Sequence, residues 1–141
     1  QLRADGAVMV TASHLPWNRN GLKFFTAKGG LEKADIARIL ELAPQFMGAE
    51  KKGNGEVKAV DFMATYCDIL ANYIRRGVND GDQPLKGMRI IVDAGNGAGG
   101  FFANNVLKPL GADTTGSQFL EPDGHFPNHI PNPENKDAKP L

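Results

Sequence analysis

Apolar positions in the first part of the chain predict two strands and a helix. A short apolar run at 7–10 and a β-rich run at 22–26 flank a polar turn, so we expect two strands, the first of them buried. Apolar residues then recur at helical spacing and predict a helix over 33–43. Pro44 is expected to end that helix.

A second, longer helix is predicted over 59–76. Its apolar positions form one broad stripe, made of Phe62, Met63, Tyr66, Ile69, Leu70, Tyr73 and Ile74. Arg75 and Arg76 fall in the last turn, where cations complement the helix dipole, and Gly77 is expected to stop the helix. Cys67 lies in the same run, so we interpret it as a small core residue and not as a nucleophile.

The pattern restarts in the last third of the chain. Residues 88–92 are predicted as a strand, 101–110 as a helix with Gly111 at its C-terminal cap, and 117–120 as a second strand. This order is a β-turn-α-β unit, the building block of a layered α/β domain. From Glu121 onward, repeated prolines predict an extended loop without a strand or helix.

Composition narrows the functional classes. Sixteen basic and sixteen acidic residues cancel over 141 residues, so no excess of positive charge argues for a nucleic-acid or membrane partner. No apolar run approaches the roughly 20 residues of a membrane span. The single cysteine fits a reducing compartment, and no signal or transit pattern is visible. We therefore expect a cytoplasmic or plastid protein that is not secreted.

Candidate chemistry gathers in the turn between the first two strands, at Thr11-Ala12-Ser13-His14-Leu15-Pro16 and Asn20-Gly21-Leu22-Lys23. Ser13 follows a strand end, where loops usually carry functional groups. His14 adds a titratable group and Lys23 a cation within plausible reach. Taken alone, a Ser-His pair in a turn is usually solvent-facing, and a single lysine before two phenylalanines is an exposed strand residue.

A glycine-rich turn offers a different interpretation. Residues 95–100 satisfy the pattern G-x-G-x-x-G between a predicted strand and helix, and Glu121 follows about twenty residues later. That arrangement is expected of a dinucleotide-binding fold, because glycines let the backbone approach a pyrophosphate. Glycines also serve any tight strand-to-helix turn, and Glu121 is followed at once by a proline.

The serine turn resembles the active-site loop of the α-D-phosphohexomutases, the phosphoglucomutase/phosphomannomutase family, whose pattern is T-A-S-H-N-P followed by N-G-x-K. Residues 92–100 are similar to the family's V-D-x-G-N-G-x-x-G turn, 110–112 to its L-G-A, and 123–134 to its D-G-x-F-P-N-H-x-P-N-P-E loop. The similarity runs from about residue 7 to 134. These motifs are more specific than a six-residue glycine pattern, so they favour the mutase interpretation.

The resemblance implies layered α/β/α domains of phosphohexomutase type, incomplete in this chain. Residues 1–58 would be the C-terminal part of domain 1, which carries the phosphoserine loop, and 59–141 the N-terminal part of domain 2. The polar, glycine-rich stretch 48–55 is a surface loop or boundary between them. The family has four domains, so the remaining mutase domains are implied partners.

The resemblance also implies a reaction, the interconversion of hexose 1-phosphate and hexose 6-phosphate through a bisphosphorylated sugar. Ser13 would carry the phosphate, Lys23 would stabilise charge and act as acid or base, and His14 would help to position the phosphate. The parent enzyme would use Mg²⁺, held in this chain only through the phosphate on Ser13. The family's D-G-D-x-D-R magnesium loop is absent from this chain, so we expect the fragment itself to be inactive and to bind magnesium weakly or not at all.

Three residues depart from the family pattern. Leu15 stands where the family usually has asparagine, and Trp17 and Arg19 are atypical of bacterial members. A catalytically inactive, mutase-like interaction subunit therefore remains an alternative, as does the dinucleotide-binding module. The preferred sugar phosphate is left open.

Overall fold

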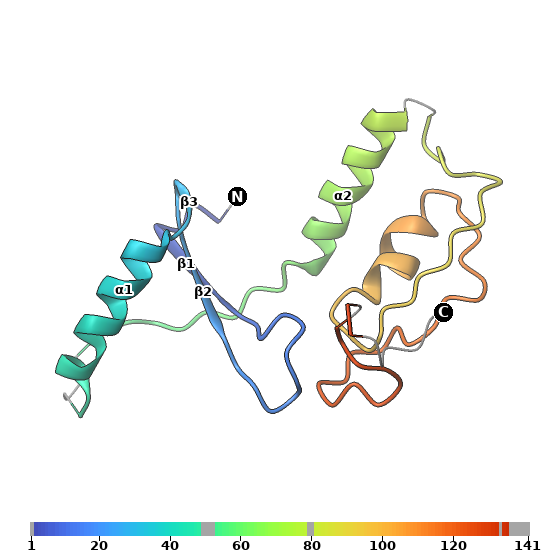
Figure 1. Cartoon of the computed structure of the whole chain (residues 1–141). Coiled ribbons are helices and arrows are strands. Elements are labelled where there is room, and N and C mark those ends of the chain that lie inside the picture. Colours follow the sequence, from blue (N-terminus) through green and yellow to red (C-terminus); the bar gives the residue numbers. More distant parts are fainter. Residues whose placement is uncertain (1, 49–52, 79–80, 133, 136–141) are drawn as a thin grey trace. The chain divides into compact units, whose positions relative to one another are not determined.

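The computed structural model describes residues 2–48, 53–78, 81–132 and 134–135. The chain forms two compact units, one made of residues 1–13 and 18–58, the other of residues 14–17 and 59–141 (Figure 1). Both combine helices with extended chain, which confirms the predicted α/β class. Of the loop predicted at 48–55, residues 49–52 lie outside the described residues, and 53–55 are exposed and form neither helix nor strand.

The first unit contains a three-stranded antiparallel sheet in the order β1-β2-β3, made of β1 (Gly6–Val10), β2 (Leu22–Thr26) and β3 (Gly29–Gly30). Both predicted strands are confirmed, with Val10 paired to Leu22 next to the loop. The expectation that the first strand is buried is wrong. All five residues of β1 are exposed, Val10 at 71%, because within the described part of this unit only β2 packs against the strand.

Helix α1 (Lys33–Leu42) follows the sheet and confirms the helix predicted over 33–43 to within one residue. The backbone N–H of Glu32 donates to Oδ2 of Asp35 (3.0 Å), which fixes the first turn. The 3₁₀ helix η1 (Ala43–Phe46) begins where α1 ends and contains Pro44 near its start. Pro44 therefore ends the α-helix as predicted, because its ring cannot continue the hydrogen-bond ladder.

Helix α2 (Met63–Val78) is the first element of the second unit. It begins and ends later in the chain than the helix predicted over 59–76. The Asp61 carboxylate accepts a hydrogen bond from the N–H of Met63 (3.1 Å), which sets the start. Gly77 does not stop the helix, so that prediction is wrong. The last turn is braced by the Arg75 guanidinium, which donates to the Asp82 carbonyl and to the Asn72 side chain (both 3.2 Å).

The buried face of α2 is centred on Cys67 and Ala71, and the prediction of Cys67 as a core residue is confirmed. Tyr73, which we placed in the apolar stripe, is 69% exposed. Leu70 and Ile74 of the predicted stripe pack against the core. That core belongs to the second unit and joins α2 to the helix that follows the glycine turn; it consists of Cys67, Ala71, Leu85, Val106, Leu107, Leu110 and Ala112.

Neither of the segments predicted as strands, 88–92 and 117–120, forms a continuous strand, and Phe119 in the second has a left-handed φ of +52°. The chain pairs in parallel here through two isolated bridges, Arg89 with Asp113 and Asp93 with Gln118, and Asp93 and Asp113 lie outside the predicted strands. The second segment carries one more residue between these bridges than the first, which is a bulge. At the bulge the N–H of Val92 donates to Oγ of Ser117 (3.1 Å), so a side chain replaces the backbone partner of a regular strand.

A short helix over 101–107 confirms the predicted helix in place but not in full length. Its larger part is the π-helical element η2 (Ala103–Leu107), in which the N–H of Lys108 donates to the carbonyl of Ala103 (3.0 Å). Gly111 has φ +95°, and the N–H of Ala112 donates back to the Leu107 carbonyl (3.2 Å). Gly111 is thus the predicted C-terminal cap.

The described residues from Glu121 onward form neither helix nor strand, which confirms the predicted extended loop. In the described part of the chain, no helix has the length and apolar character needed to cross a membrane.

Candidate functional site

The loop that carries Ser13 is closed at its base between β1 and β2. The N–H of Thr11 donates to the carbonyl of Gly21 (2.9 Å), and a Cβ at Gly21 would lie 2.5 Å from the Thr11 carbonyl oxygen. The absence of a side chain at Gly21 therefore permits this closure. We call this closed base, Thr11 and Gly21, the neck of the loop. Within the loop, the N–H of Ser13 donates to Oγ1 of Thr11 (3.0 Å).

Ser13 itself adopts a left-handed backbone conformation, with φ +58°, and is exposed. For a residue with a Cβ this region costs about 1–2 kcal/mol, so the surrounding loop must hold it there. Backbone strain of this kind gathers at functional sites, where it fixes the direction of one side chain. The geometry thus presents the Ser13 hydroxyl on a closed, strained turn.

The two other predicted site residues lie near this turn along the chain. Lys23 is the second residue of β2, exposed and paired with Met9, and it lies just beyond the neck of the loop. His14 follows Ser13 directly and lines a pocket of the second unit. The structure therefore places Ser13 and Lys23 at the same end of the β1–β2 hairpin, and their chemical roles stay predictions.

The glycine turn at 95–100 is filled by the chain's own loop. A Cβ at Gly100 would lie 1.6 Å from the Leu120 carbonyl oxygen, and one at Gly95 would lie 2.6 Å from Cε1 of His129. Both glycines are therefore required by the close approach of residues 120–129. This packing supports a structural role for the glycine turn.

Asn96 links the same turn to that loop through several hydrogen bonds. Its N–H donates to the Phe119 carbonyl (2.8 Å), and its side-chain amide donates to the Glu121 carbonyl (2.9 Å). The Asn128 amide donates to Oδ1 of Asn96 (2.7 Å), and the N–H of Asp123 donates to the Asn96 carbonyl (2.8 Å). Glu121, the candidate ribose ligand of the dinucleotide interpretation, is thus an exposed loop residue whose carbonyl holds Asn96.

An Asp-His pair strengthens this connection. Nε2 of His129 lies 3.1 Å from Oδ1 of Asp93, which also accepts the N–H of Gly95 (2.8 Å), while Oδ2 accepts the Gln118 amide (3.0 Å). Burial raises the pKa of Asp93, whose side chain is 7% exposed, but the hydrogen bonds from His129, Gly95 and Gln118 outweigh it and hold the pKa below its ordinary value.

The same hydrogen bond raises the pKa of His129, and a further one to the Ile130 carbonyl adds to the shift. The ring of Phe119 lies edge-on to the imidazole, with centroids 5.7 Å apart. Sequence analysis did not find the Asp93–His129 pair. The available signal was that each residue belongs to a family motif, Asp93 to residues 92–100 and His129 to residues 123–134. The structure shows that these two polar residues pair across the turn.

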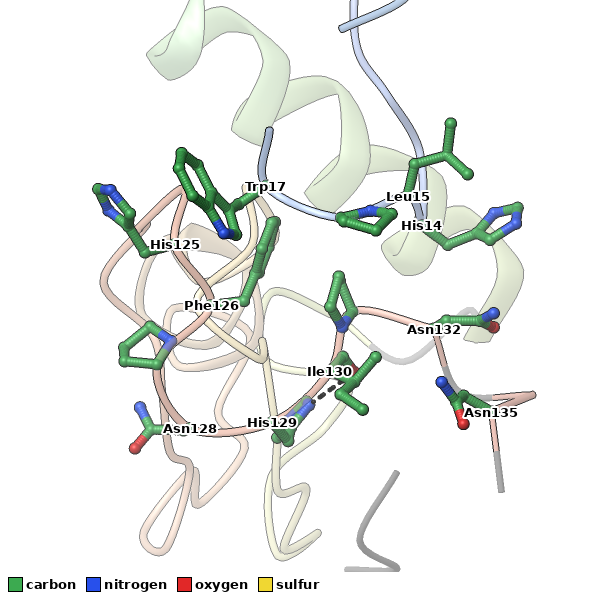
Figure 2. A pocket seen from close by; sticks show the side chains of 13 residues that line it. His14, Leu15, Trp17, His125, Phe126, Asn128, His129, Ile130, Asn132 and Asn135 are labelled. Atoms are coloured by element: carbon green, nitrogen blue, oxygen red, sulfur yellow. Dashed lines mark hydrogen bonds between the residues drawn. The ribbon is translucent and has the colours of Figure 1, made fainter. Parts of the chain in front are cut away.

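A pocket of about 620 Å³ lies in the second unit and is lined by residues 14–17 on one side and by residues 125–132 and 135 on the other (Figure 2). Among the described residues, those that line it are histidines, asparagines, prolines and apolar side chains, and none is a lysine, arginine, aspartate or glutamate. The pocket can therefore donate and accept hydrogen bonds without fixed charge. Figure 2 shows Trp17 beside His125 at one side of the pocket, away from His14.

The described residues do not supply a complete set of ligands for a magnesium ion. No group of three or more histidine, cysteine, aspartate or glutamate side chains is placed there to hold a metal ion. A magnesium site usually needs one or two carboxylates beside a phosphate oxygen. These residues alone therefore do not fit the metal.

Comparison with family models matches both halves of the chain. Residues 64–140 match the model described as phosphoglucomutase/phosphomannomutase, alpha/beta/alpha domain II, and residues 1–45 match the one described as domain I of the same enzymes. A solved structure of a phosphoglucomutase/phosphomannomutase family protein from Burkholderia thailandensis superposes with a TM-score of 0.69 at 29% identity. The match covers 94% of this chain and 27% of the Burkholderia chain.

Curated relatives agree with these matches. Over 141 residues the chain is 36% identical to a phosphomannomutase from Escherichia coli, which covers 94% of this chain and 30% of that protein. It is 35% identical to a phosphoglucomutase from Neisseria gonorrhoeae, covering 89% of this chain and 25% of that protein. The chain thus spans less than a third of the length of these relatives. Both are bacterial proteins, so they give the plastid expectation no support.

Proposed function

Because this chain belongs to the phosphoglucomutase/phosphomannomutase family, we propose that it is part of a phosphohexomutase in which Ser13 carries the transferred phosphate. The enzyme would interconvert hexose 1-phosphate and hexose 6-phosphate. The observation that carries the proposal is the exposed Ser13 on its closed turn, with φ +58°. A strained, loop-fixed hydroxyl suits a group that must meet a substrate in one orientation.

The proposed reaction consists of two phosphoryl transfers. In the first, a sugar hydroxyl oxygen forms a bond to the phosphorus on Ser13, the bond from phosphorus to Oγ breaks, and the hydroxyl proton passes by way of Lys23 to the released Oγ. The bisphosphorylated sugar then turns round. Oγ of Ser13 forms a bond to its other phosphorus, the bond from that phosphorus to the sugar oxygen breaks, and the serine proton passes to the sugar oxygen, which restores the phosphoserine. Each transfer spreads negative charge over the equatorial oxygens of the phosphoryl group, so cationic stabilisation is required.

Lys23 is the proposed cation and proton carrier. It lies on β2, just beyond the neck that closes the serine loop, and the residue is exposed. His14, which is adjacent to Ser13, is proposed to help position the phosphate. Two groups of this kind supply the charge stabilisation and proton transfer that the two steps need.

Magnesium is proposed for the complete enzyme only. Its contact in this chain would be the phosphate on Ser13, and its chemistry would be neutralisation of phosphoryl charge. The carboxylates that the family supplies lie in a motif that this chain does not contain. The roles given above are those of Ser13, Lys23 and His14, the residues that this chain itself supplies.

We further propose that residues 1–58 are part of domain 1 and 59–141 part of domain 2. The division of contacts near residue 58 and the start of the second family match at residue 64 support this boundary. Since the chain spans less than a third of its relatives, the remaining domains would have to complete the sugar and metal sites. The 141-residue chain alone is proposed to be inactive.

The proposal is tested by turnover of the full-length protein that contains this chain. With a catalytic amount of hexose bisphosphate, it should convert glucose 1-phosphate or mannose 1-phosphate to the 6-phosphate. Absence of conversion with either sugar, in a folded full-length protein, would contradict the proposal. That outcome would favour the inactive interaction subunit, which the departures at Leu15, Trp17 and Arg19 keep in view.

A further inference from the structure

Trp17 makes an aromatic contact that the proposed chemistry does not use. Its indole lies with its centroid 5.3 Å from that of the His125 imidazole, and the planes are tilted by 40° (Figure 2). The residue is nevertheless 64% exposed, so the contact covers one part of the ring only. Trp17 is also one of the three departures from the family pattern in the serine turn.

The partner of Trp17 is itself held in place. Oδ1 of Asp123 accepts the N–H of His125 (2.9 Å) and lies 3.1 Å from Nδ1 of its ring. Asp123 in turn donates its N–H to the Asn96 carbonyl (2.8 Å), and Asn96 belongs to the glycine turn described above. The imidazole, whose side chain is 75% exposed, is therefore connected to the glycine turn through Asp123 by this set of hydrogen bonds.

Ser13 lies in the chain between Thr11 on one side and the segment His14–Trp17 on the other. On the N-terminal side, Thr11 binds both the loop neck and the N–H of Ser13. On the C-terminal side, the segment His14–Trp17 belongs to the second unit, where Trp17 contacts His125. A left-handed serine persists only where its surroundings fix it, so an anchor on this side bears directly on its geometry.

We propose that Trp17 is a positioning residue for Ser13: its indole, packed against His125, fixes the segment His14–Trp17 and thereby the direction of the serine hydroxyl. This inference rests on the proposed function, because it assigns Trp17 a part in phosphoryl transfer. A large, rigid ring suits such an anchor, since it offers a wide contact and has only two side-chain torsions to immobilise.

The kinetic test uses the full-length protein with Trp17→Ala, Trp17→Phe, His125→Ala and the double variant W17A/H125A. Trp17→Ala should lower kcat by about 10- to 100-fold, the effect of a small misplacement of a reacting group, with KM unchanged. Trp17→Phe should recover most of that loss because it keeps a ring against His125. In the Trp17→Ala background, His125→Ala should lower kcat little further, since both substitutions remove the same contact between the two rings.

The exposed Tyr73 on α2 supplies the matched control, and Tyr73→Ala should leave kcat unchanged. A rise in KM at constant kcat in Trp17→Ala would overturn the proposal and identify Trp17 as a substrate-binding residue instead. Fully additive losses from Trp17→Ala and His125→Ala would also overturn it, as would a Trp17→Phe variant no better than Trp17→Ala.

Fluorescence separates this inference from the proposed function. Trp17 is the single tryptophan of the 141-residue chain, so its emission reports on its own surroundings. Quenching of that emission by acrylamide should be stronger in His125→Ala than in the unaltered chain, whether or not the full-length protein turns over sugar phosphates. If the full-length protein is inactive while quenching responds, the proposed function fails and the contact stands. Unchanged quenching would overturn the positioning role itself.

Discussion

Nε2 of His129 lies 3.1 Å from Oδ1 of Asp93, a contact that joins residues 36 positions apart in the chain. Asp93 closes the first extended segment of the second unit, and His129 belongs to the proline-rich loop that follows the second. The pair therefore ties the glycine turn to the loop that carries His125. The described residues of this loop, 121–132 and 134–135, form neither helix nor strand, so such side-chain contacts hold it in place.

This pair should make the stability of the second unit depend on pH in two directions. The folded pKa of Asp93 lies below its unfolded value, so its contribution is present above about pH 4 and is lost as pH falls through the folded pKa. The folded pKa of His129 is raised, so its contribution is present below about pH 6.5 and is lost as pH rises through the folded pKa. The combined effect is largest between these values.

The pH effect can be measured by urea unfolding of the unaltered chain and of His129→Phe from pH 3 to 9. The difference in free energy of unfolding should be greatest between about pH 4 and 6.5 and should shrink on both sides. In the Asp93→Asn background, His129→Phe should lose most of this pH dependence. A difference that stays constant over the whole range would contradict the account of the pair.

Gly100 and Gly99 provide a matched pair for the glycine turn. A Cβ at Gly100 would meet the Leu120 carbonyl oxygen at 1.6 Å, whereas one at Gly99 would meet no atom within 4 Å. Gly100→Ala should therefore destabilise the protein by about 3 kcal/mol or more, because two backbone segments must move apart. Gly99→Ala should be neutral or slightly stabilising. Thermal unfolding of both variants checks this, and equal stabilities would show that the close approach is wrong.

Local signals in the sequence sufficed for several elements of this fold. The hairpin strands, the stop at Pro44 and the cap at Gly111 depend on residues close in sequence, and all three were predicted. The buried state of Cys67 was predicted from helical spacing, which also places a residue locally. These are the features that propensity, proline geometry and glycine conformation decide without reference to the rest of the chain.

Features that depend on distant contacts were missed. The segment predicted as a strand at 88–92 is interrupted because Ser117 supplies a side-chain acceptor to Val92, 25 residues away. The exposure of β1 follows from what packs on it, which the pattern of apolar residues does not reveal. The serine turn was found as a motif, whereas the link from Trp17 to His125 joins residues that no local pattern connects.

Lys23 is expected to matter for rate, and Lys28 offers its control. In the full-length protein, Lys23→Ala should lower kcat by about two to four powers of ten, since the transferring phosphoryl group loses its cation and proton carrier. Lys28→Ala changes an exposed lysine in the turn after β2 and should leave kcat unchanged. Steady-state kinetics with hexose 1-phosphate measure both. Equal rates for the two variants would remove Lys23 from the mechanism.

The 141-residue chain by itself should show no mutase activity and only weak magnesium binding. The described residues do not group three metal-binding side chains, and the family's aspartate loop is absent from the sequence. Calorimetric titration with Mg²⁺ and a coupled assay with glucose 1-phosphate test the two parts. Conversion of glucose 1-phosphate by the purified chain would contradict the proposed dependence on further domains.

The central claim is that Ser13 carries the phosphate, and the most direct measurement is mass spectrometry of the full-length protein with peptide mapping. A serine hydroxyl is a weak nucleophile, so its activity must come from the fixed geometry and charges around it. The account predicts one phosphate on Ser13, and none in Ser13→Ala, which should fold normally and lose nearly all turnover. An unmodified Ser13, together with wild-type turnover in Ser13→Ala, would contradict it.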